Sequence, residues 1–341
     1  DYGYRSGINK TMTDHLKRTA KVLSKKTKLK SSDYVLDIAS NDGTLLNSYN
    51  KNIIKVGIDP IVNKFKKFYK NIDYPINNFF SANSIFNKKL NKKFKIITAL
   101  SVFYDLQDPN TFLQDINKII DKKDGIFLLE HTDLLSIIKK NLFDTICHEH
   151  LEYYSVEVII NMAKQNNLRV FDIETNDING SSVRFFICNR DAKYKTNAVK
   201  IKNYVKKENK AGLKTKKCYS LFFNRVIKIK KKLKNVLKKI KSEGKIIHGY
   251  GASTKGNVLL QFFKIKKKYI PIIADRNLEK NNSFTPGTKI RIVSEKISRA
   301  KNPNYYLVLP WHFKDEILKR EIEIRKKGTK LIFPLPRFKI Y

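Results

Sequence analysis

Two apolar runs that each end in a carboxylate are the most informative pattern of hydrophobic and polar positions in this chain. The segment VLDIASNDGTLL, residues 35–46, is an apolar run that ends in Asp37 and passes into small polar residues. The segment VGIDP, residues 56–60, is a second apolar run, which ends in Asp59. Together they predict a strand, turn, helix and strand unit of the kind that binds a nucleotide cofactor at the carboxyl ends of its strands.

Further apolar runs extend this unit into a larger domain. Strands are expected at residues 78–82, 94–103, 125–131 and 183–188, with helical stretches between most of them. An amphipathic helix, capped by Thr13 or Asp14, is expected before the first strand. The alternation of strands and helices predicts a Rossmann-like, doubly wound α/β domain.

The second half of the chain changes in character. Residues 198–241 are Lys-rich, with apolar residues at three-and-four spacing, which predicts a helical connector with one solvated face. Gly244 ends it, and residues 245–263 repeat the strand, glycine turn and helix pattern. With strands at 270–275, 305–310 and 330–336, they predict a second, smaller Rossmann-like domain. The domains expected are therefore 1–195, a connector at 196–243, and 244–341.

The glycine pattern of the first turn indicates which cofactor is bound. A dinucleotide turn needs three spaced glycines, and here only Gly43 is glycine, so no pyrophosphate is expected. Asp59 is placed to accept hydrogen bonds from ribose hydroxyls, and Asp37 to meet a cationic amino-acid end, which together favour S-adenosylmethionine. The alternative is that both carboxylates only cap helices. The predicted cofactor-binding residues are Asp37, Ala39, Ser40, Asn41, Asp42, Gly43, Asp59 and Ser101.

Composition and charge limit the kinds of partner that this chain is expected to bind. The chain has 341 residues and 41% hydrophobic content, enough for two packed domains. Its formal charge of +39 would suggest nucleic acid, but the Lys excess is spread from Lys10 to Lys339 without a stacking platform, so no nucleic-acid partner is expected. The charge either steers a diphosphate substrate or has no role. The three cysteines are far apart and no apolar run is membrane-length, so a cytoplasmic protein without a membrane partner is expected. We expect a monomer or a small homo-oligomer.

The segment FDTICHEHLEYYS, residues 143–155, is the expected centre of chemistry. A histidine with a near-neutral pKa is a common general base, and either His150 or His148 could serve. In an extended segment these two side chains point the same way and Glu149 the other. The alternatives are a zinc pair, which lacks a third ligand nearby, and two structural histidines. No metal is therefore expected in this chain.

Several motifs resemble, in order, those of the sugar-nucleotide C-methyltransferase family. They are YGYRSGINKTM, ASNDG, FDTICHEHLEYYS, NGSSVRFF, GYGASTKGNVLL, DRNLEKNNSFTPGTKI and WHF. The resemblance implies methyl transfer from S-adenosylmethionine to the carbon beside the ketone of a nucleotide-linked 4-keto-6-deoxy sugar. It implies His150 as the base, with Glu149 and His148 beside it. It also implies Tyr2 or Tyr4 as hydroxyl donors around the sugar, although these tyrosines could equally pack in the core.

The family's members resemble three-part proteins with an amino-terminal zinc-binding domain. The printed sequence starts at Asp1, inside the Tyr-rich motif, so an upstream segment is expected to lie outside it.

Two departures from the family pattern leave the methylated position open. Cys147 stands where the family usually has Tyr, and Tyr104 and Asp105 stand where many members carry His. An O-methyltransferase using the same base is one alternative. A nucleic-acid methyltransferase and a cofactor-binding protein without catalysis are two others. The expected substrate-binding residues are Tyr104, Asp105, Gly251, Ser253, Thr254, Lys255 and Asn257.

Overall fold

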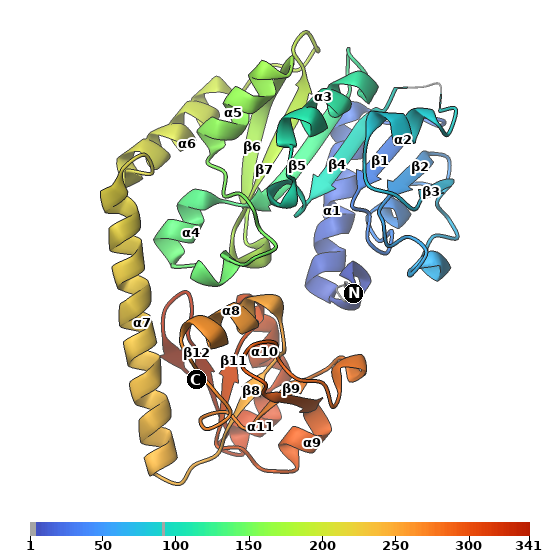
Figure 1. Cartoon of the computed structure of the whole chain (residues 1–341). Coiled ribbons are helices and arrows are strands. Elements are labelled where there is room, and N and C mark those ends of the chain that lie inside the picture. Colours follow the sequence, from blue (N-terminus) through green and yellow to red (C-terminus); the bar gives the residue numbers. More distant parts are fainter. Residues whose placement is uncertain (1–4, 91–92) are drawn as a thin grey trace. The chain divides into compact units, whose positions relative to one another are not determined.

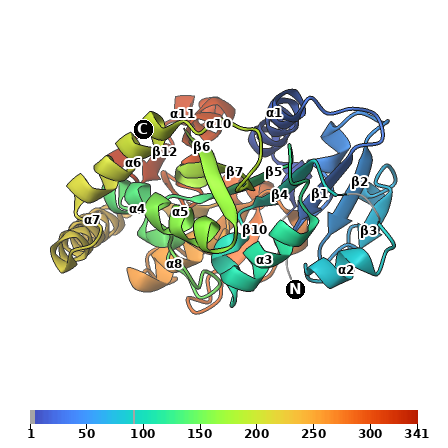
Figure 2. The same ribbon diagram turned by 90° about the horizontal axis from the view of Figure 1, so that it is seen from above.

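The strands of the amino-terminal half form one seven-stranded sheet in the order β3-β2-β1-β4-β5-β7-β6, and Figure 2 shows its labels in that sequence. The computed structural model describes residues 5–90 and 93–341. Strands β3, β2, β1, β4 and β5 run parallel, whereas β7 is antiparallel to both β5 and β6. The strands are β1 Tyr34–Ile38, β2 Ile54–Ile58, β3 Tyr74–Ile76, β4 Ile96–Leu100, β5 Ile126–Thr132, β6 Leu168–Asn176 and β7 Ser182–Asn189.

Helices cover both faces of this sheet (Figure 1). Successive residues of β1 point to opposite faces, so Leu36 packs in one core with α2, α3 and α5, and Val35 packs in the other with α1. The helices are α1 Lys10–Thr27, α2 Ala82–Phe86, α3 Pro109–Ile119, α5 Val156–Gln165 and α6 Ala198–Ala211. The predicted doubly wound α/β domain is confirmed.

The carboxyl-terminal half forms a second sheet, of six strands, in the order β10-β9-β8-β11-β12-β13. All neighbours are parallel except β13, which is antiparallel to β12. The strands are β8 Ile247–Tyr250, β9 Ile272–Asp275, β10 Arg291–Ser294, β11 Tyr305–Val308, β12 Lys330–Phe333 and β13 Lys339–Ile340. The remaining helices are α4 Leu134–Lys140, α7 Lys216–Ser242, α8 Thr254–Phe262, α9 Glu295–Arg299, α10 Lys314–Arg320 and α11 Ile322–Lys326. The expected second Rossmann-like fold is present.

The two compact units that the packing defines have other boundaries than the domains expected from the sequence. Unit 1 comprises Asp1–Asp133 and Leu151–Glu208, and unit 2 comprises Leu134–His150 and Asn209–Tyr341. Leu134–His150 packs within unit 2, where Phe143 stacks on Phe263, the C-cap of α8, with ring centroids 4.8 Å apart. The chain therefore leaves unit 2 directly after the HEH motif (residues 148–150), between His150 and Leu151.

Some predicted elements are wrong. No α-helix follows β1: the segment to β2 is a series of turns with one short 3-10 helix, Leu46–Ser48. A single turn there already buries both Leu45 and Leu46. Residues 78–82 are not a strand, and Phe79 is 76% exposed. The edge strand is the adjacent Tyr74–Ile76.

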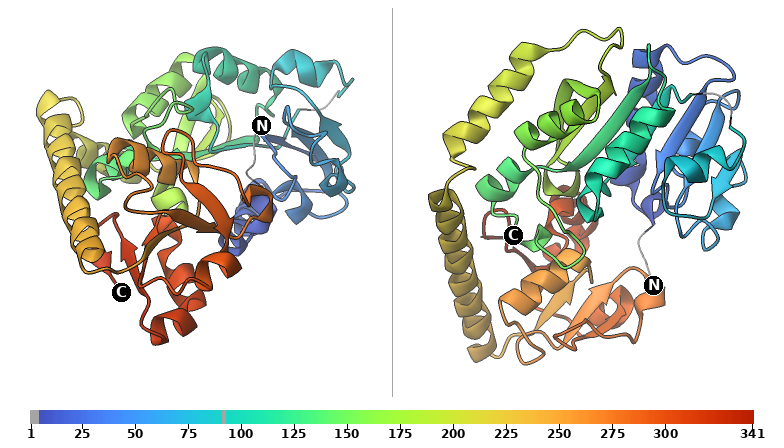
Figure 3. Two further views of the ribbon diagram at one scale, coloured as in Figure 1. Left: turned by 60° about the horizontal axis from the view of Figure 1, so that its bottom comes forward. Right: turned by 45° about the horizontal axis from the view of Figure 1, so that its top comes forward.

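Two helix ends also differ from expectation. The cap of α1 is Asn9, whose side chain accepts a hydrogen bond from the Met12 N–H, rather than Thr13 or Asp14. The connector consists of α6 and α7, separated by a turn that begins at Gly212 with a positive φ of 73°. Helix α7 is 27 residues long. Both views in Figure 3 show it as one continuous helix.

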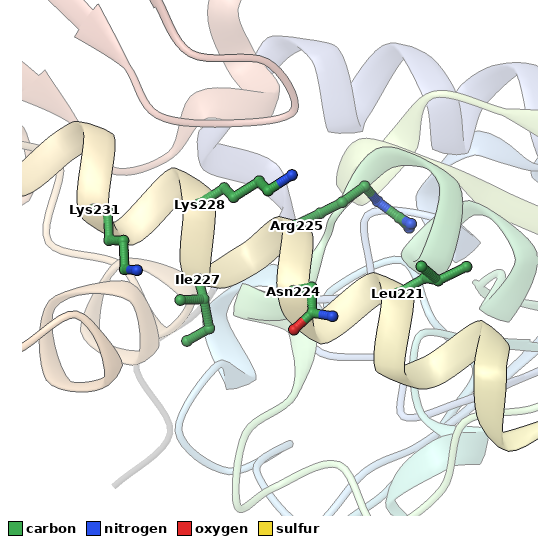
Figure 4. Close-up of a pocket in the computed structure, with 6 residues that line it drawn as sticks. All are labelled: Leu221, Asn224, Arg225, Ile227, Lys228 and Lys231. Atoms are coloured by element: carbon green, nitrogen blue, oxygen red, sulfur yellow. The ribbon is translucent and has the colours of Figure 1, made fainter.

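Helix α7 is amphipathic, as predicted, and its buried residues are Cys218, Phe222, Val226, Leu233, Leu237 and Ile240. A pocket lies along it, and Figure 4 shows the residues that line it: Leu221, Asn224, Arg225, Ile227, Lys228 and Lys231. Arg225 also ties α7 to α4, donating from Nε to Asn141 Oδ1 at 2.8 Å and from Nη2 to the carbonyl of Ile138. None of the predicted site residues lines this pocket. Over residues 5–90 and 93–341, no helix is both long and apolar enough to cross a bilayer.

Candidate active site

The turn after β1 has an unusual backbone. Ala39, Asn41 and Gly43 all have positive φ, of 56°, 51° and 72°. Positive φ costs free energy for Ala in particular, and such residues gather at ligand sites. The Tyr69 hydroxyl supports the turn, donating to the Asn41 carbonyl at 2.8 Å and lying 2.8 Å from Ser40 Oγ. The sequence therefore builds a rigid turn beside the carboxyl ends of the parallel strands.

Asp37 lies at the end of β1 with its carboxylate buried. Thr98, its neighbour on β4, donates to Asp37 Oδ1 at 2.6 Å. Burial raises the pKa of Asp37 to about 7, the Thr98 hydrogen bond opposes the rise, and the charge of Asp59 adds to it. Within residues 5–90 and 93–341, no Lys, Arg or His side chain forms an ion pair with Asp37. A buried carboxylate without a cation fits a ligand that carries positive charge.

Asp59 closes β2 and fixes the same turn. Its Oδ2 accepts the Asn41 N–H and its Oδ1 accepts the Ile61 N–H, both at 2.9 Å. Burial raises the pKa of Asp59, and these two backbone donors oppose the rise. Each carboxylate oxygen can accept a second hydrogen bond, so the donor set fits the predicted role toward ribose hydroxyls.

Asn41 and Asp42 hold a segment that precedes α1. The Ser6 N–H donates to Asn41 Oδ1 and the Gly7 N–H donates to Asp42 Oδ2, each at 2.9 Å. Arg5 Nε lies 3.3 Å from Asp42 Oδ2. A cofactor role for these two side chains stays a prediction, because their oxygens already accept hydrogen bonds from this segment.

Ser101, Tyr104 and Asp105 follow β4. Ser101 has a positive φ of 59°, and its hydroxyl accepts the side-chain N–H of Asn179 at 3.1 Å. Tyr104 lies in a short 3-10 helix, and its carbonyl accepts the N–H groups of Leu151 and Glu152 at 2.9 and 3.1 Å. Their roles toward cofactor and substrate stay predictions. Tyr2 and Tyr4 lie outside the described residues.

In unit 2 the HEH motif is a turn and not an extended segment. The His150 N–H donates to the Cys147 carbonyl at 3.2 Å, so His148 and Glu149 occupy the corner of the turn. The His148 side chain is 87% exposed, whereas His150 is half-buried. The expectation that the two imidazoles point the same way as alternate residues of a strand is therefore wrong. Of the two, His150 is the one enclosed by protein.

The ring of His150 is held by the backbone carbonyl of Thr145. Burial lowers the pKa of His150 to about 4, the Thr145 hydrogen bond opposes the fall, and the charges of Lys255 and His148 add to it. The imidazole is consequently neutral at physiological pH and can accept a proton. Among the described residues, no three His, Cys, Asp or Glu side chains are grouped closely enough to hold a metal ion.

Lys255 sits among several ionisable groups of unit 2. Its burial lowers the pKa of Lys255, and Asp144 and Cys147 oppose the fall. Burial lowers the pKa of His312 to about 3, and the charge of Lys255 adds to this fall. Burial raises the pKa of Asp144, and the charge of Lys255 opposes that rise. Asp144, Trp311 and His312 were not predicted as site residues. The DTI and WHF motifs that contain them were the available signal.

The glycine turn after β8 packs closely against the rest of unit 2, and some of its amides form hydrogen bonds within the protein. A Cβ on Gly251 would lie 2.6 Å from Pro310, and Gly251 has a φ of 80°. The Ala252 N–H donates to Asp275 Oδ2 at 2.7 Å, and Ser253 Oγ caps α8 by accepting the Gly256 N–H at 3.1 Å. Two amides of this turn are therefore engaged within the protein. Substrate binding by Gly251, Ser253, Thr254, Lys255 and Asn257 stays a prediction.

Comparison with known proteins identifies the class to which this site belongs. Residues 4–173 match the family model described as a methyltransferase domain, and residues 177–336 match the model described as the C-methyltransferase C-terminal domain. The chain thus belongs to the methyltransferases, and within them to the C-methyltransferase family. The resemblance stated from the motifs is confirmed.

The particular relatives are distant. The curated C-methyltransferase NovU from Streptomyces niveus is 27% identical over 242 residues, which are 71% of this chain and 57% of that protein. A methyltransferase structure from Clostridium acetobutylicum gives a TM-score of 0.41 at 12% identity, over 52% of this chain and 92% of the other. The structure of magnesium protoporphyrin IX methyltransferase from Synechocystis, with bound S-adenosylhomocysteine, gives a TM-score of 0.40 at 11% identity. This match covers 55% of this chain and 90% of the other.

Proposed function

We propose that this chain transfers a methyl group from S-adenosylmethionine to a carbon of a nucleotide-linked 4-keto-6-deoxy sugar. The observation that carries the proposal is the state of His150. This half-buried imidazole is neutral at physiological pH because its pKa is lowered to about 4, and its ring is held by the Thr145 carbonyl. It lies in a chain whose two halves match a methyltransferase domain and a C-methyltransferase C-terminal domain.

The residues of unit 1 would hold the cofactor. Asp37 would pair with the ammonium group and Asp59 would accept from the ribose hydroxyls, on the supports described above. When bound, S-adenosylmethionine would supply an electrophilic sulfonium methyl group: a carbanion that donates its electron pair to the methyl carbon gains a carbon–carbon bond, while the carbon–sulfur bond breaks and its electron pair stays on the leaving thioether, S-adenosylhomocysteine.

The residues of unit 2 would activate the acceptor. The carbon beside a ketone is acidic because the resulting anion delocalises into the carbonyl. His150 removes that proton, so the C–H electron pair becomes the enolate and the proton stays on the ring until solvent removes it. Lys255 and the amino-terminal turn of α8 would attract an anionic group of the substrate through their positive charge and helix dipole.

A labelled-methyl assay tests the proposal. Isotopically labelled S-adenosylmethionine is incubated with dTDP- and GDP-linked 4-keto-6-deoxy sugars, and the product is examined by NMR for a new carbon–methyl bond. His150→Ala should reduce turnover at least about a hundredfold while leaving cofactor affinity within about twofold. His148→Ala is the matched control, because the exposed His148 should be dispensable as a base. Label on oxygen would indicate the O-methylating alternative, and full activity of His150→Ala would refute the base assignment.

A further inference from the structure

Three segments that are far apart in sequence converge within unit 2. The Trp311 indole N–H donates to Asp144 Oδ2 at 2.6 Å across 167 residues of sequence. Phe143 stacks on Phe263 at 4.8 Å and lies 5.7 Å from the ring of Phe262. The 3-10 turn Phe143–Thr145 is thus fixed on one side by α8 and on the other by the WHF segment.

His150 depends on that turn for the placement of its ring. The Thr145 carbonyl accepts from the His150 ring, and the Thr145 N–H is itself bound to the Leu142 carbonyl at 3.1 Å. When a neutral imidazole donates from one nitrogen, the other carries the lone pair that accepts a proton. Displacement of the turn would therefore change both the orientation and the tautomer of His150.

The Asp144–Trp311 hydrogen bond also supports a buried carboxyl group, where it acts together with the stronger effect of the Lys255 charge. Asp144 is 1% exposed, and among the described residues its Oδ1 has no hydrogen-bond partner. Lys255 is the cation that acts on it. Loss of the indole donor would leave this buried carboxylate with the charge of Lys255 but without the Trp311 hydrogen bond. Because a buried polar group that loses its hydrogen bond is costly, the turn should be displaced rather than left in place.

We propose that Asp144 and Trp311 are positioning residues for His150, acting through the Phe143–Thr145 turn and the Thr145 carbonyl. They touch neither cofactor nor substrate in this scheme. The inference rests on the proposed function for its catalytic meaning, whereas its structural content can be measured without any substrate.

The structural test uses the full chain and the fact that it holds a single tryptophan and six histidines. Trp311 gives one indole N–H resonance, and isotope-edited NMR of labelled histidines, assigned with His150→Gln, follows the His150 ring. Trp311→Phe should release the ring toward solvent and move its titration midpoint upward, from near 4 toward the ordinary value, by at least about one pH unit. Asp144→Asn keeps an oxygen acceptor for the indole and should leave the His150 tautomer as in wild type.

Tyr306→Phe is the matched control for stability. It removes another buried hydrogen bond of unit 2, the 2.9 Å contact between the Tyr306 hydroxyl and Ser298 Oγ. It should leave the His150 titration unchanged. If Trp311→Phe does not fold, Asp144→Leu replaces it, because an apolar side chain of similar volume removes the acceptor without leaving a buried charge.

The functional test follows exchange of the substrate proton beside the ketone in deuterium oxide, without cofactor turnover. Trp311→Phe should slow exchange at least about tenfold with the cofactor Kd unchanged, and Asp144→Asn should stay within about threefold of wild type. Wild-type titration and exchange in Trp311→Phe would overturn the inference. Absence of both exchange and methylation in the wild type would refute the proposed function instead. The NMR titration of His150, which needs no substrate, would then be the measurement that decides whether Asp144 and Trp311 position His150.

Discussion

Thr98 on β4 donates its hydroxyl to Oδ1 of Asp37 on the adjacent parallel strand β1, at 2.6 Å. It is the interaction that most opposes the effect of burial on this carboxyl group, whose pKa nevertheless rises to about 7. Asp37 is therefore partly protonated near neutral pH in the ligand-free protein. A bound cation would favour the ionised form and displace that proton.

Cofactor affinity should depend on pH through Asp37. Below a pKa of about 7 the carboxyl group must lose a proton before it can pair with an ammonium group, so the Kd for S-adenosylmethionine should fall as pH rises from 5.5 to 7, by up to about tenfold per unit. Calorimetry in buffers of different ionisation enthalpy would measure both the Kd and the released proton. Asp37→Asn should bind weakly with no such pH dependence, and a flat wild-type profile would contradict the assignment.

The same carboxylate should destabilise the ligand-free fold at neutral and alkaline pH. The folded-state pKa of Asp37 is raised above its unfolded value, so the native state binds more protons between about pH 4 and 7 and loses stability as pH rises. Asp37→Asn should consequently raise the Tm of the ligand-free protein at pH 8 and have less effect at pH 4, as measured by thermal denaturation. Thr98→Val, which removes the opposing hydrogen bond, should lower the Tm at pH 8. An equal effect of Asp37→Asn at both pH values would argue against an ionised buried carboxylate.

Asp59 should affect cofactor binding both directly and through the turn. Asp59→Ala removes the acceptor of the Asn41 and Ile61 N–H groups, and we expect the Kd for S-adenosylmethionine to rise by at least about tenfold. Asp59→Asn retains one oxygen acceptor and should lie between Asp59→Ala and wild type. Equilibrium dialysis would measure the series. Equal affinities in all three proteins would show that β2 does not end in the cofactor site.

Burial mainly lowers the pKa of His150, and Lys255 should add to this effect on the acid limb of the rate profile. Its positive charge disfavours the imidazolium form of His150, so removing it with Lys255→Met should raise the pKa of His150 and move the acid limb of kcat/KM to higher pH. The pH–rate profile of an active substrate measures this limb. Lys319→Met removes a charge from the exposed side of α10 and should leave the limb in place. A shift in the opposite direction would mean that Lys255 does not act on His150.

The local sequence pattern was sufficient to predict an element where the residues of one segment both form that element and carry the candidate site residues. The apolar runs before Asp37 and Asp59 predict the strands β1 and β2, and the repeated pattern near Gly251 predicts β8 and α8. Pattern failed where distant contacts decide conformation. The segment after β1 contains helix-forming residues, yet burial of Leu45 and Leu46 and the contacts of Tyr69 hold it in turns.

The amino-acid order alone determined the two α/β folds, the carboxylates at their strand ends and the HEH motif. It did so because strand periodicity and turn composition are properties of neighbouring residues. Only the tertiary structure decided that His150 belongs to unit 2, that its ring rests on the Thr145 carbonyl, and that Asp144 meets Trp311. Burial and long-range hydrogen bonds set those relationships and the protonation states that follow from them, and neither is encoded in the spacing of adjacent residues.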